Sequence, residues 1–491
     1  MMKIMRISKN ILQRNNEEKI SEADFVSNMV RTWLGNPISR GLLRYVSKRN
    51  ENGSKIELAM RKYVGDDVKM GIDDKLVYLV VKYALEKGAD SFGFPREELK
   101  KSLKEPVVRR GMVNILEGIA EFGVQTPQTT AAPFLIVWDF THRCNLKCKH
   151  CYQDADQKPF EDELSTEEAK AVIDQLFDIG VVAIAFSGGE PLARPDFFEI
   201  AEYAKSKDFY VAVASNGTLI TPKIAKKLKK VVDYIEISLD GFEKTHDSFR
   251  GMPNAWKLAC RGIKNCVAAG IDTCVATTVT RLNYKEIPKL IEFVEKDLKA
   301  RRMIFFNFVP TKRGKEIMKY DIEPREREKL LKFLYSKLID KECKLDIFST
   351  APQYARIAVE FGEACVPTHF VNKDAIEMLK GRTKTLSEFI GGCGCARLYA
   401  ALEPNGDIYP CVFLPLKVGN IRENSFKEIW KNSDTLKKLR DRNSFKGCGA
   451  CKFKNICGGC RARAYGYFGD LQGPDPGCII NQRYWEELKN A

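Results

Sequence analysis

The chain lacks several features that would place it among membrane, secreted or repeat proteins. No apolar run approaches the ~20 residues that a membrane-spanning helix needs. The basic start, residues 1–10, is not followed by the apolar core of a signal peptide, and no internal repeat is visible. Residues 1–143 contain no cysteine. We therefore expect a cytoplasmic protein in which the later cysteines have a special role.

Length and composition describe a large soluble chain. With 491 residues it is expected to form two or three domains, and 44% hydrophobic against 30% charged residues excludes wholesale disorder. The 80 Lys and Arg exceed the 65 Asp and Glu, which gives a net charge of +15. No zinc-finger helix, helix-turn-helix spacing or aromatic-basic platform accompanies this charge, so we expect no nucleic-acid partner.

The 16 cysteines are unevenly distributed. A reducing compartment does not favour disulfides, so clustered cysteines there indicate metal binding or catalysis. Eleven cysteines fall into three groups. The first is a triplet, Cys144, Cys148 and Cys151, and the second is Cys393, Cys395 and Cys411. The third lies close to the end of the sequence and contains Cys448, Cys451, Cys457, Cys460 and Cys478. The other five, Cys260, Cys266, Cys274, Cys343 and Cys365, are expected to be small apolar core residues.

The middle of the chain alternates strands with helices. Six β-rich runs are each followed by a helical pattern: 133–138, 181–186, 210–214, 234–238, 273–279 and 303–309. This alternation predicts a buried parallel sheet, and six units predict an α/β, partial (β/α)6 TIM-like barrel. Chemistry in such barrels lies at the carboxyl ends of the strands. Cys144, the Gly188–Pro191 turn, Asn216 and Asp240 each follow a strand and are expected to converge there.

The cysteine triplet is the strongest signal. Three thiolates in one loop can hold three irons of a cubane and leave the fourth iron open, as a catalytic site requires. The alternative is a structural zinc loop, to which His150 would supply the fourth ligand.

The segment Cys144–Tyr152, Cys-Asn-Leu-Lys-Cys-Lys-His-Cys-Tyr, resembles the signature of the radical S-adenosylmethionine (SAM) enzymes. The resemblance implies that the triplet holds a catalytic 4Fe-4S cluster whose open iron chelates SAM. An electron from the cluster would cleave SAM to a 5′-deoxyadenosyl radical, which abstracts hydrogen from an unactivated C–H bond. The cofactor carries this chemistry, and the protein positions it.

The same resemblance assigns further residues to SAM. The Gly-Gly-Glu-Pro turn would bind its amino group, Tyr152 would lie near the adenine, and polar residues after two later strands would face the ribose or carboxylate. The implied SAM-binding residues are Tyr152, Gly188, Gly189, Glu190, Pro191, Ser215, Asn216, Ser238 and Asp240. Asn-Gly and Asp-Gly sequences also form ordinary turns, so the last four rest on weaker grounds.

The tail cysteines are regularly spaced, and eight of them suffice for two four-iron clusters or two zinc sites. The tail resembles the SPASM extension of radical SAM enzymes. By that resemblance Cys393, Cys395, Cys411 and Cys460 hold one auxiliary 4Fe-4S cluster, and Cys448, Cys451, Cys457 and Cys478 hold the other. The chain then carries three 4Fe-4S clusters. The spacing before Cys460 departs from the common SPASM pattern and is more similar to the haem and haem d1 maturases; Cys365 is the alternative ligand if Cys393 or Cys395 is not one.

We expect four regions: a helical N-terminal domain (1–130), the barrel (131–312), a helical linker (313–388) and the cysteine-rich iron–sulfur domain (389–491). The first 50 residues hold ten Lys or Arg against four Asp or Glu. An apolar stripe over 25–34 and a second from Ile38 to Val46 lie beside these charges. They fit either peripheral contact with an anionic membrane or a helix packed on the barrel with a solvated basic rim. Lys75–Lys87 is predicted to be a buried core helix, 109–122 another helix, and 126–130 a linker.

The first functional hypothesis is a radical SAM oxidoreductase acting on a long apolar chain, such as an archaeal membrane lipid. The alternatives are a peptide maturase or a tetrapyrrole-modifying enzyme of haem biosynthesis. A non-catalytic iron–sulfur electron carrier is disfavoured, because a carrier needs no open iron. The basic surface suits an acidic electron donor, such as a ferredoxin or flavodoxin. The oligomeric state stays open.

Overall fold

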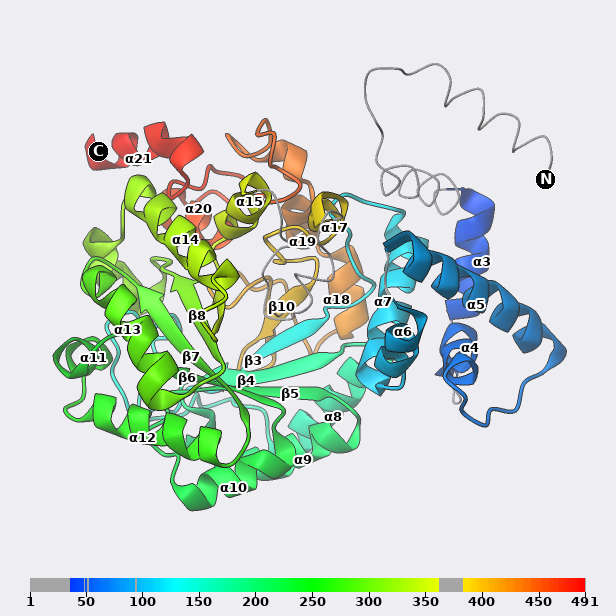
Figure 1. Ribbon diagram of the computed structural model, residues 1–491, viewed down its shortest axis with the longest axis horizontal. Helices are drawn as coiled ribbons and strands as arrows, with labels where there is room; N and C mark the ends of the chain where they lie inside the picture. The colour runs from blue at the N-terminus through cyan, green and yellow to red at the C-terminus, as the bar shows by residue number, and fades with distance from the viewer. Residues whose placement is uncertain (1–35, 48, 51–52, 93–94, 362–382, 491) are drawn as a thin grey trace.

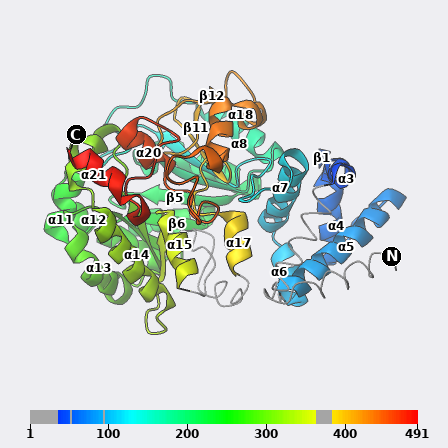
Figure 2. The same ribbon diagram turned by 90° about the horizontal axis from the view of Figure 1, so that it is seen from above.

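The computed structural model describes residues 36–47, 49–50, 53–92, 95–361 and 383–490. A curved sheet with helices on its outer side forms the centre, the N-terminal helices stand to one side, and the cysteine-rich tail covers one end (Figure 1). A second view, turned by 90°, shows the same three parts (Figure 2). In the described part of the chain, no helix has the length and apolar character to cross a membrane.

The sheet has ten strands in the order β12-β11-β10-β3-β4-β5-β6-β7-β8-β9. Its barrel strands are β3 (Leu135–Thr141), β4 (Ala183–Gly188), β5 (Tyr210–Ser215), β6 (Tyr234–Ser238), β7 (Asp272–Val279), β8 (Arg302–Asn307) and β9 (Asp346–Ser349). All neighbours from β3 to β9 are parallel. The six predicted strands and the open, partial barrel are confirmed.

The sheet continues beyond the six predicted strands at both edges. Residues 313–388, expected to be a helical linker, also contain β9, and α14 (Pro324–Ile339) is its crossover helix. At the other edge the tail adds β10 (Tyr399–Leu402) parallel to β3, followed by antiparallel β11 (Asp407–Tyr409) and β12 (Gly419–Asn420). The tail is therefore built onto the strand that leads into the cysteine triplet.

The helices on the outer side of the barrel are α8 (Thr166–Asp178), α9 (Phe197–Ser206), α10 (Pro222–Val231), α11 (Glu243–Arg250), α12 (Ala255–Ala268) and α13 (Ile287–Phe293). A capping box starts α8, where the side chains of Ser165 and Glu168 each hydrogen-bond the other residue's backbone N–H. Strand alternation separates two apolar faces. Trp138 and Phe140 join the large core under the helices, whereas Tyr234 and Phe348 belong to a smaller cluster on the other face.

Four of the unclustered cysteines, Cys260, Cys266, Cys274 and Cys343, are buried, as expected of small apolar residues. Cys365 lies outside the described residues. The remaining helices of the second half are α15 (Gln353–Glu360), α17 (Thr383–Ile390), α18 (Phe426–Asn432), α19 (Asp434–Arg440), α20 (Arg461–Phe468) and α21 (Gln482–Asn490).

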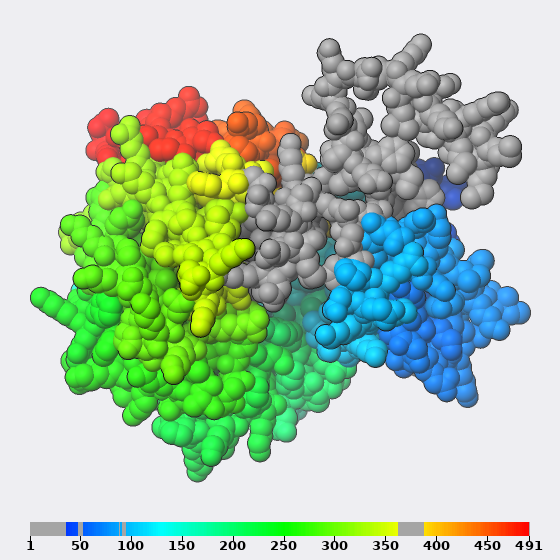
Figure 3. All heavy atoms as spheres, viewed as in Figure 1, coloured from blue at the N-terminus to red at the C-terminus, as the bar shows by residue number. Residues whose placement is uncertain are grey.

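The N-terminal region is helical, as predicted. It contains α3 (Pro37–Ser47), α4 (Lys55–Tyr63), α5 (Ile72–Phe92), α6 (Arg96–Leu103) and α7 (Pro106–Phe122), together with a two-strand pair, β1 (Arg49–Asn50) and β2 (Gly53–Ser54). These helices have a small core of their own. They project beside the barrel (Figure 3). The predicted apolar stripe over 25–34 lies outside the described residues.

One expectation for this region was wrong. α5 is not a buried core helix: Val77, Val81 and Leu85 pack inward, but Leu76 and Leu79 are 66% and 61% exposed. The helix is apolar on more than one face, and its neighbours cover only one of them.

The predicted linker 126–130 lies between α7 and β3 and is buried against the tail. Gln128, Thr129 and Thr130 are buried. The Thr130 hydroxyl donates to the Arg397 carbonyl at 2.8 Å, and the Trp430 indole donates to the Thr130 carbonyl at 3.0 Å. The segment is thus bonded into the tail.

Candidate functional site

The cysteine triplet lies in the loop that follows β3. Cys148 is buried, and Cys144 and Cys151 are half-buried. Burial, with the charges of Glu190 and of the neighbouring thiols, raises the pKa of Cys144 to about 12. The backbone N–H groups of Leu146 and Ala155 point at the sulfur atoms of Cys144 and Cys151, each at 3.4 Å. Backbone donors aimed at sulfur stabilise thiolates, so the loop fits metal-bound cysteines.

Helix α11 packs against this loop. The Lys149 N–H donates to the Phe249 carbonyl at 2.9 Å, and the His150 ring stacks on Phe249 with 4.2 Å between centroids. Burial lowers the pKa of His150. Gly251 ends the helix so close to Lys147 that a Cβ there would lie 2.5 Å from the Lys147 carbonyl oxygen. The loop is therefore held from behind by an element that the motif did not reveal.

The Gly-Gly-Glu-Pro turn follows β4 and meets the start of the same loop. The N–H groups of Gly189 and Glu190 donate to the carbonyls of Thr141 and Arg143, both at 2.8 Å. A Cβ on Gly189 would lie 2.1 Å from the Arg143 oxygen, and Gly188 has φ +106°. The glycines thus allow close approach to the cysteine loop itself, which the sequence did not indicate.

Glu190 connects several of the predicted residues. Its buried carboxylate accepts from the Ser215 hydroxyl at 2.9 Å and from the Asn216 N–H at 2.8 Å. Burial raises the pKa of Glu190 to about 7. The Asn216 side chain donates to Asn145 in the cysteine loop at 2.8 Å. Glu190, Ser215 and Asn216 therefore meet as predicted, and Asn145 is a member that the sequence analysis missed.

Tyr152 lies beside a buried acidic pair. Its hydroxyl is 2.7 Å from Ser187 Oγ and donates to Asp139 at 3.3 Å. Asp139 and Glu403 are both buried, and the Gln153 amide donates to each. Burial and the charge of Glu403 raise the pKa of Asp139 well above its usual range. The sequence analysis missed this pair. The only sign of it in the sequence is Asp139, a carboxylate within an otherwise apolar strand.

Ser238 and Asp240 end and follow β6. Ser238 is half-buried, whereas Asp240 is fully buried. Both Asp240 carboxylate oxygens have partners: one accepts from Arg250 Nε at 2.6 Å, the other from the Thr278 N–H at 2.9 Å. The roles of these residues, and of the whole SAM set, stay predictions.

The first predicted tail group is brought together by the loop before β10, the segment after β11 and the start of α20. Cys411 hydrogen-bonds the Cys395 thiol and, with burial, raises the pKa of Cys395; the charges of Cys393 and Cys460 add to this shift. The Tyr399 hydroxyl donates to Cys411 Sγ. These four thiols are the set that the SPASM resemblance implies for one cluster.

The second tail group lies in the loops around α20. Burial raises the pKa of Cys457, with further contributions from the charges of Cys478 and Cys448. The Cys451 N–H donates to the Cys448 carbonyl at 3.2 Å. In the described ranges, no group of three or more His, Cys, Asp or Glu side chains is arranged so as to hold a single metal ion, as a zinc site would.

Buried arginines surround both tail groups. Arg397 and Arg442 each donate to the Cys393 carbonyl, and neither forms an ion pair with a carboxylate in the described part of the chain. Burial lowers the pKa of both guanidinium groups. Buried Arg461 donates to Cys448 Sγ at 3.6 Å. An unpaired buried cation is costly, so these surroundings fit anionic, thiolate-bound clusters.

Comparison with known proteins identifies two family matches. Residues 138–294 match the Radical SAM superfamily, and residues 393–458 match SPASM, an iron-sulfur cluster-binding domain. The AdoMet-dependent heme synthase of Methanosarcina barkeri is 39% identical over 354 residues, which are 71% of this chain and 97% of that protein. The enzyme of the same name from Nitratidesulfovibrio vulgaris is 38% identical over 71% of this chain and 93% of its own length.

Solved structures share the fold. Streptococcus suis SuiB bound to precursor peptide SuiA is 16% identical, with a TM-score of 0.58 over 87% of this chain and 92% of that chain. The structure of anSMEcpe with bound AdoMet is 22% identical, with a TM-score of 0.54 over 72% of this chain and 98% of that chain. A Radical SAM domain implies a 4Fe-4S cluster and SAM as cofactors, and a SPASM domain indicates auxiliary clusters. This chain is an enzyme that belongs to the radical SAM superfamily and carries a C-terminal SPASM domain.

Proposed function

We propose that this enzyme modifies a tetrapyrrole on a route to haem. The observation that carries the proposal is the 39% identity to a heme synthase over nearly that protein's whole length. A second relative, the Fe-coproporphyrin III synthase of Methanosarcina barkeri, is 34% identical. This proposal replaces the lipid substrate as the main hypothesis, because both relatives are named for tetrapyrrole synthesis.

An aromatic surface at the mouth of the barrel supports a flat substrate. The Phe413 ring of the tail lies 5.0 Å from the Tyr152 ring of the cysteine loop and 6.3 Å from the Phe306 ring of β8, between centroids. All three side chains are half-buried, so part of each stays accessible. A conjugated macrocycle stacks favourably on such rings. The surface joins the loop, the barrel and the tail, where substrate and cofactor have to meet.

The protein's own groups have positioning roles. With cluster and SAM bound, the cofactor supplies the one-electron chemistry that activates a C–H bond. Cys144, Cys148 and Cys151 would hold the cluster. The Glu190 carboxylate, oriented by Ser215, would accept a hydrogen bond from the SAM ammonium group. Asp139 of the buried pair beside Tyr152 would hold a proton close to the substrate surface, because burial and Glu403 favour its neutral form, whereas Lys312, 3.7 Å from Glu403, favours ionised Glu403.

A competition experiment tests the substrate. The reconstituted enzyme is incubated anaerobically with SAM and reductant, and separately given iron-coproporphyrin III, a total lipid extract or a peptide pool. We expect iron-coproporphyrin alone to stimulate 5′-deoxyadenosine release and to change in mass. Stimulation by peptide instead would favour the second candidate, a peptide maturase. The 29% identity to a mycofactocin maturase supports that candidate. Stimulation by lipid would restore the first hypothesis.

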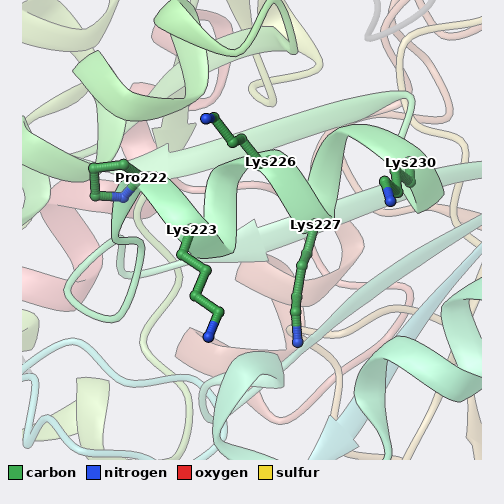
Figure 4. Close-up of a pocket in the computed structure, with 5 residues that line it drawn as sticks. All are labelled: Pro222, Lys223, Lys226, Lys227 and Lys230. Carbon is green, nitrogen blue, oxygen red and sulfur yellow. The ribbon is translucent and has the colours of Figure 1, made fainter.

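For electron delivery we propose an acidic donor protein that docks on the outer face of the cysteine loop. Arg143, just before the first cysteine, and Lys147 and Lys149, between the cysteines, are exposed, and none forms an ion pair with a described residue. A separate basic surface lies on α10, where four lysines line one pocket: Lys223, Lys226, Lys227 and Lys230 (Figure 4). An unpaired basic face attracts an acidic partner and speeds its association.

Charge reversal tests this docking face. Reduction of the enzyme by flavodoxin should slow several-fold in Lys147→Glu/Lys149→Glu and at high salt, and should be unchanged in Lys438→Glu, an exposed lysine of α19. Equal rates in all three proteins would contradict the proposed face. Peripheral contact with an anionic membrane stays a prediction. On α3 the side chains of Ile38, Leu42 and Tyr45 are exposed and could make it.

A further inference from the structure

Arg250 is a buried cation that points at one of the cluster cysteines. It is the last residue of α11 and is 9% exposed. Its Nη1 donates to Cys148 Sγ at 3.7 Å, and its Nε donates to Asp240 at 2.6 Å. Neither residue was assigned to the cluster by the sequence motif, and Asp240 was expected to contact SAM.

The pair is held rigidly from several sides. The Asp240 carboxylate also accepts a hydrogen bond from the Thr278 N–H. The backbone N–H of Asp240 donates to His246 Nδ1 at 3.1 Å. The Asn283 amide donates to the Asp240 carbonyl at 2.7 Å. Burial lowers the pKa of His246 to about 3, so this imidazole is neutral and adds no charge to the pair. Arg250 and Asp240 thus form a fixed pair of opposite charges behind the Cys148 sulfur.

We infer that the Arg250–Asp240 pair sets the reduction potential of the catalytic cluster through Cys148. Three thiolates make the cluster anionic, and reduction adds a further negative charge. A guanidinium donating to a ligand sulfur favours the reduced state, because charge and hydrogen bonds at the sulfurs set cluster potentials. Asp240 opposes this effect by partly neutralising Arg250. Both act as positioning residues, since neither needs to touch SAM or substrate.

Removing the two charges separately should shift the reduction potential in opposite directions. Arg250→Gln removes the cation and leaves a buried carboxylate, so the potential should become more negative. Asp240→Asn leaves the guanidinium unneutralised, so the potential should rise. Arg250→Lys keeps the charge and should stay near the wild type. A residue that only maintained structure would not shift the potential in opposite directions on removal of the two partners.

The test is an anaerobic redox titration of the reconstituted full-length enzyme, followed by electron paramagnetic resonance. The catalytic cluster is identified as the signal that changes on SAM addition. We expect Arg250→Gln to lower the ratio of reduced to oxidised cluster at fixed potential at least tenfold, equivalent to about 59 mV for one electron. Arg313→Gln is the matched control, because Arg313 donates to the Cys148 and Ala155 carbonyls rather than to sulfur.

The outcomes are decisive either way. Unchanged potentials in Arg250→Gln and Asp240→Asn, or shifts of the same sign, would overturn the inference. Iron content after reconstitution checks cluster assembly; if Arg250→Gln fails to hold iron, the rise expected for Asp240→Asn still decides. The measurement uses no substrate, so it stands or falls independently of the tetrapyrrole proposal.

Discussion

Glu190 offers a direct test of the SAM site through pH. Burial raises its pKa to about 7, against the opposing hydrogen bonds from Asn216 and Ser215. The group is therefore largely protonated below pH 7 and ionised above it. A SAM ammonium is held by the ionised form, because a charge-assisted hydrogen bond needs the carboxylate. We expect the affinity for SAM to fall as the pH falls through 7, and to fall at every pH in Glu190→Gln.

The size of the effect follows from the pKa. About a tenth of the carboxyl groups are ionised at pH 6 and about nine-tenths at pH 8, so the Kd should change about tenfold, or about 1.4 kcal/mol. The folded pKa exceeds the ordinary value of 4.5. Between pH 4.5 and 7 the folded state thus binds more protons than the unfolded state, and stability without SAM falls as pH rises, by about 3 kcal/mol across the window.

Anaerobic calorimetry of SAM binding at pH 6, 7 and 8, at constant ionic strength, measures the first effect. Glu190→Gln should show weaker binding without this pH dependence. Glu202→Gln, on the exposed side of α9, is the control and should match the wild type. A wild-type Kd that does not change over this range, or an unaltered pH profile in Glu190→Gln, would refute the reasoning.

Three further predictions concern the turn, the tail and the substrate surface. Gly189→Ala should lose catalytic-cluster iron, measured by colorimetric iron analysis, because its Cβ would lie 2.1 Å from the Arg143 oxygen. Cys411→Ser and Cys457→Ser should each lose one different auxiliary cluster by Mössbauer spectroscopy; loss of the same cluster in both would contradict the two-group assignment. Phe413→Ala should raise the KM for iron-coproporphyrin about tenfold and leave SAM affinity unchanged. The reason is that aromatic stacking contributes about 1 kcal/mol in addition to the burial of surface area. An unaltered KM would show that Phe413 is not part of the substrate surface.

The strands and the clustered cysteines were predictable because their signals are local. Six apolar runs gave six strands, and the carboxyl ends of parallel strands brought Glu190 and Ser215 together as expected. β9 was missed because only four residues, Asp346–Ser349, form it. The exposed faces of α5 were missed because apolar composition does not say how many neighbours a helix has.

The groups behind the site were not predictable, because they depend on long-range contacts. Arg250 meets Cys148 from 102 positions away in sequence, and no spacing rule connects them. Glu403 reaches Asp139 only because β10 pairs with β3. The resemblance placed Asp240 at SAM, but its partners emerged only from the packing of α11 and β7 against β6.

The most direct measurement is the fate of substrate hydrogen. Iron-coproporphyrin with deuterated side chains is incubated with the reconstituted enzyme, SAM and reductant, and the 5′-deoxyadenosine formed is analysed by mass spectrometry, with Cys148→Ala as the blank. The account predicts that the wild type transfers deuterium into 5′-deoxyadenosine and that the blank forms none. Release of unlabelled 5′-deoxyadenosine, with the tetrapyrrole unchanged, would contradict it.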